Sequence, residues 1–129
     1  MILLDTHVVL WMSSNSSRLS TPAREAILQA RESTGVAVAT FTLFELAWIA
    51  EKRRIPLSES IEKFVSETVS RLILRPMTAE IAARAVRMPA TYPKDPADRI
   101  IAATALVESM PLVTADQRIR ESGVVKTIW

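Results

Sequence analysis

The sequence predicts an α/β protein with a mainly parallel central sheet of about five strands. Short apolar runs alternate along the chain with longer segments in which apolar residues recur every three or four positions. Such alternation is typical of a parallel sheet with helices on both faces. The chain has 129 residues, and compact domains commonly contain about 100–150 residues. We therefore expect a single domain over residues 1–129.

Five short runs rich in apolar residues are predicted to form the strands. They are Ile2–Leu4, Val36–Ala39, Leu72–Leu74, Leu112–Thr114 and Val124–Ile128. Crossover connections between parallel strands are almost always right-handed, so the carboxyl ends of these strands should meet at one edge of the sheet.

The segments between the strands carry recognisable helix start signals. The predicted caps are Thr21 before Pro22, Ser58, Thr78, and Asp95 before Pro96. In the helix after Thr78, the spacing predicts that Ile81, Ala82, Ala85 and Val86 face the core.

The composition excludes several classes of site. The chain has no cysteine, which excludes zinc–thiolate sites, redox pairs and cysteine nucleophiles. Its two glycines, Gly35 and Gly123, are too few for a dinucleotide fingerprint or a phosphate-binding loop. The net charge of +2 is compatible with a nucleic-acid partner without requiring one.

The chain also lacks the usual membrane and export signals. No apolar run approaches the roughly 20 residues that a membrane span requires, and no basic segment precedes the first apolar run. We expect a cytoplasmic protein without a membrane partner.

Four acidic residues follow predicted strands or lie near helix starts: Asp5, Glu45, Asp98 and Asp116. Each has a simpler interpretation when taken alone. Asp5 and Asp116 can cap short helices, over residues 8–12 and 117–121. Thr42 and Glu45 have the spacing of a capping box, and Asp98 can complement the dipole of the helix that Asp95 caps.

Together these acids predict a different role. A parallel sheet would place Asp5, Asp98 and Asp116 at the same edge, with Glu45 on an adjoining helix. Neighbouring carboxylates repel one another and bind protons unless a cation lies among them. Oxygen ligands without cysteine suit Mg²⁺ or Mn²⁺, and such ions activate water for attack on phosphorus. The pattern indicates metal-assisted hydrolysis of phosphodiesters.

Several motifs resemble those of a known family. They are LLDTHVVLW at the start of the chain, FELA around Glu45, DPADRIIAATA in the Asp98 helix, and PLVTADQRI before the final VKTIW. In this order and spacing, the chain resembles the PIN-domain nucleases, and more closely the VapC-type toxins of bacterial and archaeal toxin–antitoxin pairs. The resemblance implies a three-layer α/β/α sandwich and a metal-dependent endoribonuclease.

The resemblance also implies roles for individual residues. Asp5, Asp98 and Asp116 would bind Mg²⁺ or Mn²⁺ directly, and Glu45 would bind through water or orient the attacking water. The residues expected around them are Thr6 and Thr114 as hydrogen-bond donors to ligand carboxylates, Arg99 as a contact to substrate phosphate or a brace for an acid, and Asp95 near the site but mainly as a cap.

The expected partners and products follow from the same resemblance. They are a homodimer, an antitoxin that covers the acidic groove, and single-stranded or looped RNA as substrate. Attack by water would leave a 5′-phosphate and a 3′-hydroxyl. One departure is the segment Tyr92-Pro93-Lys94, which replaces a stretch that often contains histidine, and it leaves no histidine for a role before Asp95.

The remaining noticeable residues have structural interpretations. The single histidine, His7, is predicted to be a hydrogen-bonded packing residue. The aromatic residues Trp11, Phe41, Phe44 and Trp48 are predicted to form core or dimer surface rather than base-stacking platforms. The basic run Lys52, Arg53 and Arg54 is predicted to complement a helix C-terminus rather than to contact an RNA backbone.

Two alternative functions fit the sequence less well. A response-regulator receiver would need a phosphorylatable aspartate after the third strand, where this chain has Arg75-Pro76. A non-catalytic binding module with the same fold remains open, although the complete set of four acids disfavours it.

Overall fold

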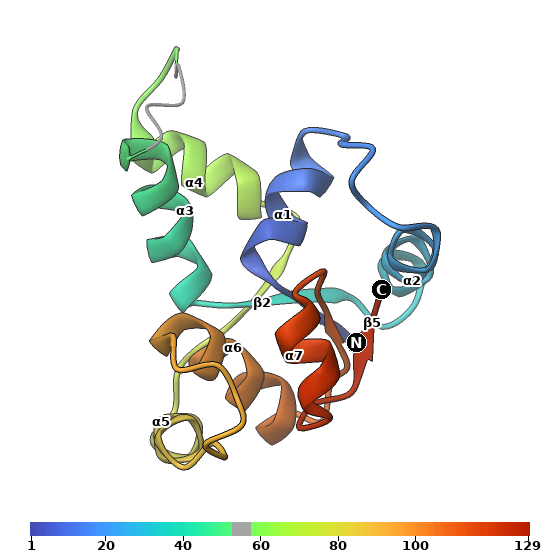
Figure 1. Ribbon diagram of the computed structural model, residues 1–129. Coiled ribbons are helices and arrows are strands. Elements are labelled where there is room, and N and C mark those ends of the chain that lie inside the picture. Colours follow the sequence, from blue (N-terminus) through green and yellow to red (C-terminus); the bar gives the residue numbers. More distant parts are fainter. Residues whose placement is uncertain (53–57) are drawn as a thin grey trace.

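A five-stranded sheet lies between two layers of helices in the computed structural model, which describes residues 1–52 and 58–129 (Figure 1). The strands are β1 (Ile2–Leu4), β2 (Val36–Ala39), β3 (Ile73–Arg75), β4 (Leu112–Val113) and β5 (Thr127–Ile128). The helices are α1 (Thr6–Ser13), α2 (Thr21–Glu32), α3 (Phe41–Lys52), α4 (Ile61–Val69), α5 (Ala79–Val86), α6 (Pro96–Val107) and α7 (Gln117–Ser122). The predicted fold class is confirmed. Within the two described ranges, no helix is long and apolar enough to span a lipid bilayer.

The order of the strands creates a switch point in the sheet. The order is β3-β2-β1-β4-β5, and each neighbouring pair is parallel. The chain proceeds from the central β1 outward to β2 and β3, and then returns to β4 and β5 on the other side. The connections that follow β1 and β4 therefore diverge at the carboxyl ends of these two strands, which is where open α/β sheets bind their ligands.

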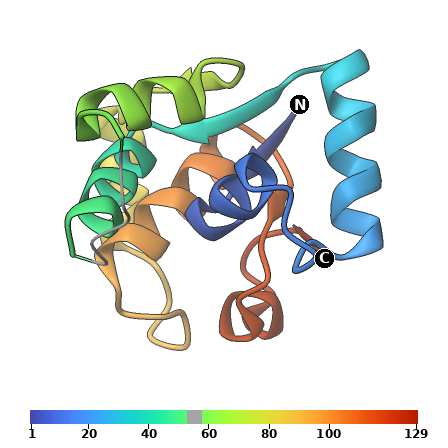
Figure 2. The same cartoon turned by 90° about the horizontal axis from the view of Figure 1, so that it is seen from above.

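The two faces of the sheet are covered by different parts of the chain. Leu3 and Ala37 pack with α5, α6 and α7, whereas Ile2 and Leu4 pack with α1 to α4. This alternation is the two-residue period of a strand buried on both faces. Figures 1 and 2 show the two layers, with α2 at one end of the molecule, α3 and α4 at the other, and α1 between them.

Two predicted helix caps are wrong by one or two residues. Ser20, not Thr21, caps α2, and its hydroxyl accepts a hydrogen bond from the backbone N–H of Ala23 at 3.2 Å. Ser60, not Ser58, caps α4 in the same way. In both cases two residues able to cap lie close together before the helix, and sequence spacing does not distinguish them. The caps at Thr78 and Asp95 are confirmed.

Several predicted boundaries and one predicted core residue also differ. Strand β3 lies one residue later than predicted, β4 ends before Thr114, and β5 is confined to two residues. Val86 is 82% exposed rather than facing the core, because the buried stripe of α5 runs through Ile81 and Ala85. Apolar periodicity gives the width of a buried face only to within about one residue on either side.

Candidate functional site

Asp5 lies at the carboxyl end of β1, beside the switch point, and only 6% of its surface is exposed. Its Oδ1 accepts a hydrogen bond from the backbone N–H of Thr6 at 2.7 Å, so Asp5 caps α1. Its Oδ2 accepts a hydrogen bond from the hydroxyl of Thr114, also at 2.7 Å. A carboxylate can accept about four hydrogen bonds. Both oxygens of this fixed carboxylate therefore retain lone pairs for a cation.

The hydroxyl of Thr114 connects two of the predicted acids. Thr114 follows β4 directly and is fully buried. Its Oγ1 donates to Asp5 and accepts a hydrogen bond from the backbone N–H of Asp116 at 3.1 Å. One buried side chain thus sets the position of the Asp116 backbone relative to the Asp5 carboxylate.

Glu45 does not form the predicted capping box. Helix α3 already begins at Phe41, so Thr42 lies inside the helix and is buried. Glu45 instead reaches across to α1, where its Oε1 accepts a hydrogen bond from the hydroxyl of Thr6 at 2.5 Å. The hydroxyls of Thr6 and Thr42 lie 3.4 Å apart. This cluster holds the Glu45 carboxylate close to the residue that follows Asp5.

Asp95 and Asp98 both lie at the start of α6, but only Asp95 caps it. Its Oδ1 accepts hydrogen bonds from the backbone N–H groups of Ala97 at 2.9 Å and Asp98 at 3.3 Å. The capping role predicted for Asp95 is therefore confirmed. The Asp98 side chain is free of that role and is only 20% exposed.

Asp116 caps α7 and also pairs with an arginine that the sequence analysis missed. Its Oδ1 accepts hydrogen bonds from the backbone N–H groups of Arg118 at 2.8 Å and Ile119 at 3.3 Å. Nη2 of Arg118 lies 2.9 Å from Oδ2 of Asp116 and 3.8 Å from Oδ2 of Asp98. The only sequence signal was a base two residues after an acid, which is common on solvated helices.

The acids influence one another electrostatically. Burial, followed by the charges of the neighbouring acids Asp5, Asp95, Asp116 and Glu45, raises the pKa of Asp98 to about 7. Burial also raises the pKa of Asp5 and of Glu45, although hydrogen bonds from Thr114 and Thr6 oppose these shifts. Only the pKa of Asp116 is lowered, chiefly by its hydrogen bond from Arg118. The site holds more negative charge than its surroundings neutralise.

The oxygen ligands of the four acids suit a hard divalent cation. In this structure, however, the four side chains are not arranged around one point. All four acids offer oxygen, the ligand that Mg²⁺ and Mn²⁺ prefer. Within residues 1–52 and 58–129, however, no group of three or more His, Cys, Asp or Glu side chains is arranged to hold a metal ion. The Arg118 guanidinium lies against two of the acids instead. Binding of a metal by these acids would require their side chains to move and Arg118 to leave them.

Among the described residues, Arg99 bonds to backbone carbonyls and not to an acid. Its Nε donates to the backbone carbonyl of Pro93 at 3.0 Å, and its terminal nitrogens lie 3.5 Å from the carbonyls of Ala85, Met88 and Tyr92. Arg99 therefore braces the loop between α5 and α6 through backbone oxygens rather than through an acid, and its contact with substrate phosphate stays a prediction. Bonds from a side chain to backbone carbonyls leave no sequence signal.

The loop before α6 is also fixed by a buried tyrosine. Tyr92 is 1% exposed, and its hydroxyl donates to the backbone carbonyl of Asp98 at 3.2 Å. Burial is the main cause that raises the pKa of this phenol. The segment that departs from the expected histidine-containing stretch therefore supplies a buried tyrosine that bonds to the start of α6.

His7 is exposed rather than a buried packing residue. Its ring lies 6.1 Å from that of Trp11, which in turn lies 5.7 Å from the ring of Trp129. The prediction of a buried packing role is wrong, because this position of α1 is exposed to solvent. Trp11 packs against the core, as predicted.

The aromatic residues of α3 form a surface beside the site. Phe44 and Trp48 are 58% and 55% exposed, and with Phe41 they line a groove of about 280 Å³ that also includes Glu45 and Asp95. They are therefore not core residues. The Lys52 ammonium lies 5.0 Å from the centroid of the Trp48 ring. Arg53 and Arg54 lie outside the described residues.

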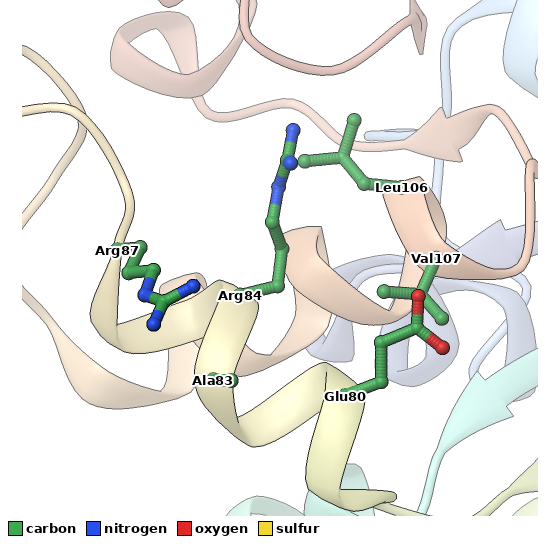
Figure 3. A pocket seen from close by; sticks show the side chains of 6 residues that line it. All are labelled: Glu80, Ala83, Arg84, Arg87, Leu106 and Val107. Atoms are coloured by element: carbon green, nitrogen blue, oxygen red, sulfur yellow. The ribbon is translucent and has the colours of Figure 1, made fainter.

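One hollow on the described surface is remote from the acids. It has a volume of about 420 Å³ and is lined by Glu80, Ala83, Arg84, Arg87, Leu106 and Val107. Figure 3 shows the Arg84 side chain extending beside Leu106 between α5 and the C-terminal end of α6. Asp98 lies at the other end of α6, roughly 13 Å away at 1.5 Å per residue. This hollow therefore does not belong to the acidic site.

Comparisons with known proteins identify the family to which the chain belongs. The model of the PIN domain matches residues 2–124. Ribonuclease VapC22 of Mycobacterium tuberculosis is 42% identical over 130 residues, covering 99% of this chain and 98% of that protein. The fold is similar to that of VapBC2 from Rickettsia felis, solved bound to a DNA fragment from their promoter, with a TM-score of 0.75, 16% identity, and coverage of 98% and 97%.

A DNA-bound VapBC from Salmonella typhimurium also shares the fold. Its TM-score is 0.73 at 21% identity, and the match covers 98% of this chain and 97% of that one. These two structures support the architecture, whereas the family model and the Mycobacterium tuberculosis relative support the activity. The chain therefore belongs to the PIN-domain family, and within it to the VapC-type ribonuclease toxins.

Proposed function

We propose that this ribonuclease depends on Mg²⁺ or Mn²⁺ and that Asp5, Asp98 and Asp116 bind the ion directly. Glu45 would bind through water or orient the attacking water. The observation that carries the proposal is the buried Asp5 carboxylate, which Thr114 links to Asp116 at the switch point of the sheet. A bound cation would offset the burial and the repulsion that together raise the pKa of Asp98.

The protein contributes mainly orientation to this reaction. The Thr114 and Thr6 hydroxyls direct the carboxylates of Asp5 and Glu45, and such supporting hydrogen bonds commonly contribute about 10- to 100-fold in metal affinity or activity. When bound, the ion would lower the pKa of a water and stabilise the leaving oxygen. The Oε2 of Glu45 would accept the proton of the attacking water.

The expected products follow from attack by water on phosphorus. The P–O bond to the ribose 3′-oxygen breaks, and that oxygen leaves as a 3′-hydroxyl. The hydroxide derived from water stays on phosphorus, so the other fragment carries a 5′-phosphate. Attack by the ribose 2′-hydroxyl would instead leave a cyclic phosphate.

The proposed partners are RNA, an antitoxin and a second copy of this chain. Several solved structures with the same fold are toxin–antitoxin complexes, which supports an antitoxin that covers the acidic groove. We further propose that residues 1–129 act as one domain in the cytoplasm, on single-stranded or looped RNA.

The proposal is tested by RNA cleavage with the purified, antitoxin-free protein. Cleavage should require Mg²⁺ or Mn²⁺, stop when EDTA is added, and disappear in Asp5→Asn with the fold intact by circular dichroism. Asp95→Asn is the matched control. Asparagine keeps the helix cap, so this variant should retain most of the cleavage activity. Equal cleavage by Asp5→Asn and the wild type would reject the assignment. Complete inactivity of the wild type with every metal would favour a non-catalytic binding module.

A further inference from the structure

Arg118 is the one basic side chain that forms an ion pair with the acidic cluster in the described part of the chain. It lies in the first turn of α7, and its side chain is 70% exposed. Its Nη2 lies 2.9 Å from Oδ2 of Asp116 and 3.8 Å from Oδ2 of Asp98. Its Nε approaches Oδ1 of Asp116 at 3.4 Å. The guanidinium therefore bridges two acids from different helices.

We infer that Arg118 is a built-in counter-ion of the metal site, which a divalent cation must displace from Asp98 and Asp116. This inference rests on the proposed function, since it takes those two carboxylates as metal ligands. It adds a residue of this chain that sets the affinity of the site for metal.

The geometry makes guanidinium and metal competitors for the same oxygens. Oδ1 of Asp116 accepts the two backbone hydrogen bonds that cap α7, so Oδ2 is the oxygen more available to a ligand. Arg118 occupies this Oδ2 and approaches the Oδ2 of Asp98. A metal that binds both oxygens would bring a second positive charge against the guanidinium. The guanidinium must therefore move away when the metal enters.

The exposure of Arg118 limits how strongly it can compete. Exposed ion pairs contribute little free energy, because water screens the charges and a long side chain loses entropy when it is held. No other ion pair fixes this guanidinium within residues 1–52 and 58–129. Arg118 should therefore reduce metal affinity moderately without preventing binding.

The test is Mn²⁺ binding to the full chain, measured by the loss of the free Mn²⁺ signal in electron paramagnetic resonance. Arg118→Met, which removes the charge, should bind Mn²⁺ about two- to fivefold more tightly than the wild type, as expected for loss of an exposed ion pair. Arg118→Lys, which keeps the charge but not the forked donors, should lie between them. Arg120→Met on the same helix is the matched control and should leave the affinity unchanged.

Each outcome separates this inference from the proposed function. If the wild type binds Mn²⁺ and Asp98→Asn abolishes binding, the metal site stands. Unchanged or weaker binding by Arg118→Met would then overturn the inference alone, and so would an equal gain in Arg120→Met. If Asp98→Asn binds Mn²⁺ like the wild type, the proposed site itself fails.

Discussion

Replacing Asp98 by asparagine should stabilise the metal-free protein. Burial and four neighbouring acids raise the pKa of Asp98 from its ordinary value of 3.8 to about 7. The folded protein therefore holds a proton that the unfolded chain releases in the same pH range. In that range, stability falls as the pH rises, because the unfolded state binds fewer protons. Asparagine has no proton to release, so the variant avoids this loss.

The structure sets the magnitude of this gain. The interval from 3.8 to about 7 spans about three pH units, and each corresponds to about 1.36 kcal/mol, which gives a ceiling of about 4 kcal/mol. The side chain is 20% exposed and lies near Arg118, and an acid near a helix N-terminus contributes about 0.3–1 kcal/mol. After these reductions we expect a gain of about 1–3 kcal/mol at pH 8.

The assay is urea unfolding of the wild type and Asp98→Asn in EDTA, at several pH values between 4 and 8. The advantage of the variant should be close to zero near pH 4, grow as the pH rises, and level off above about pH 7. An advantage that is independent of pH, or a variant that is less stable at pH 8, would refute the reasoning.

Two further predictions concern the support of the site and the backbone. Thr114→Val removes the hydroxyl between Asp5 and Asp116, so cleavage should fall about 10- to 100-fold and stability by about 1–3 kcal/mol. Thr114→Ser should retain both, and equal losses in the two variants would contradict this role. Gly35→Ala should lower the free energy of unfolding by about 1–3 kcal/mol, measured by thermal unfolding. The reason is that φ of Gly35 is +97° and the new Cβ would lie 2.6 Å from Cδ1 of Ile73. Gly123→Ala, where φ is +66° and nothing lies within 4 Å, should cost less.

The fold was predictable because its signals are local and repeated. Strand runs such as Val36–Ala39 and caps such as Asp95 depend on neighbouring residues alone. The alternation of strands and helices then restricts the topology. The errors arose where two local signals compete, as for Ser20 and Thr21, or where the width of a buried face decides, as for Val86.

The site was only partly predictable, because its contacts join distant segments. The family resemblance implied that Thr114 supports an acid, and the structure shows its bond to Asp5, 109 positions away. The capping-box spacing at Glu45 was misleading, because that carboxylate bonds to Thr6 on another helix. Arg118 and Arg99 act through contacts that depend on how helices and loops meet. Their roles are visible only after folding.

The central claim is that Asp5, Asp98 and Asp116 share a metal ion at the switch point of the sheet. The most direct measurement is a crystal structure of the protein with Mn²⁺, recorded so that the anomalous signal locates the ion. The account predicts one anomalous peak within coordination distance of these three carboxylates, with the Arg118 guanidinium moved off Asp98. A peak elsewhere on the molecule, or no peak at the acids at saturating Mn²⁺, would contradict it.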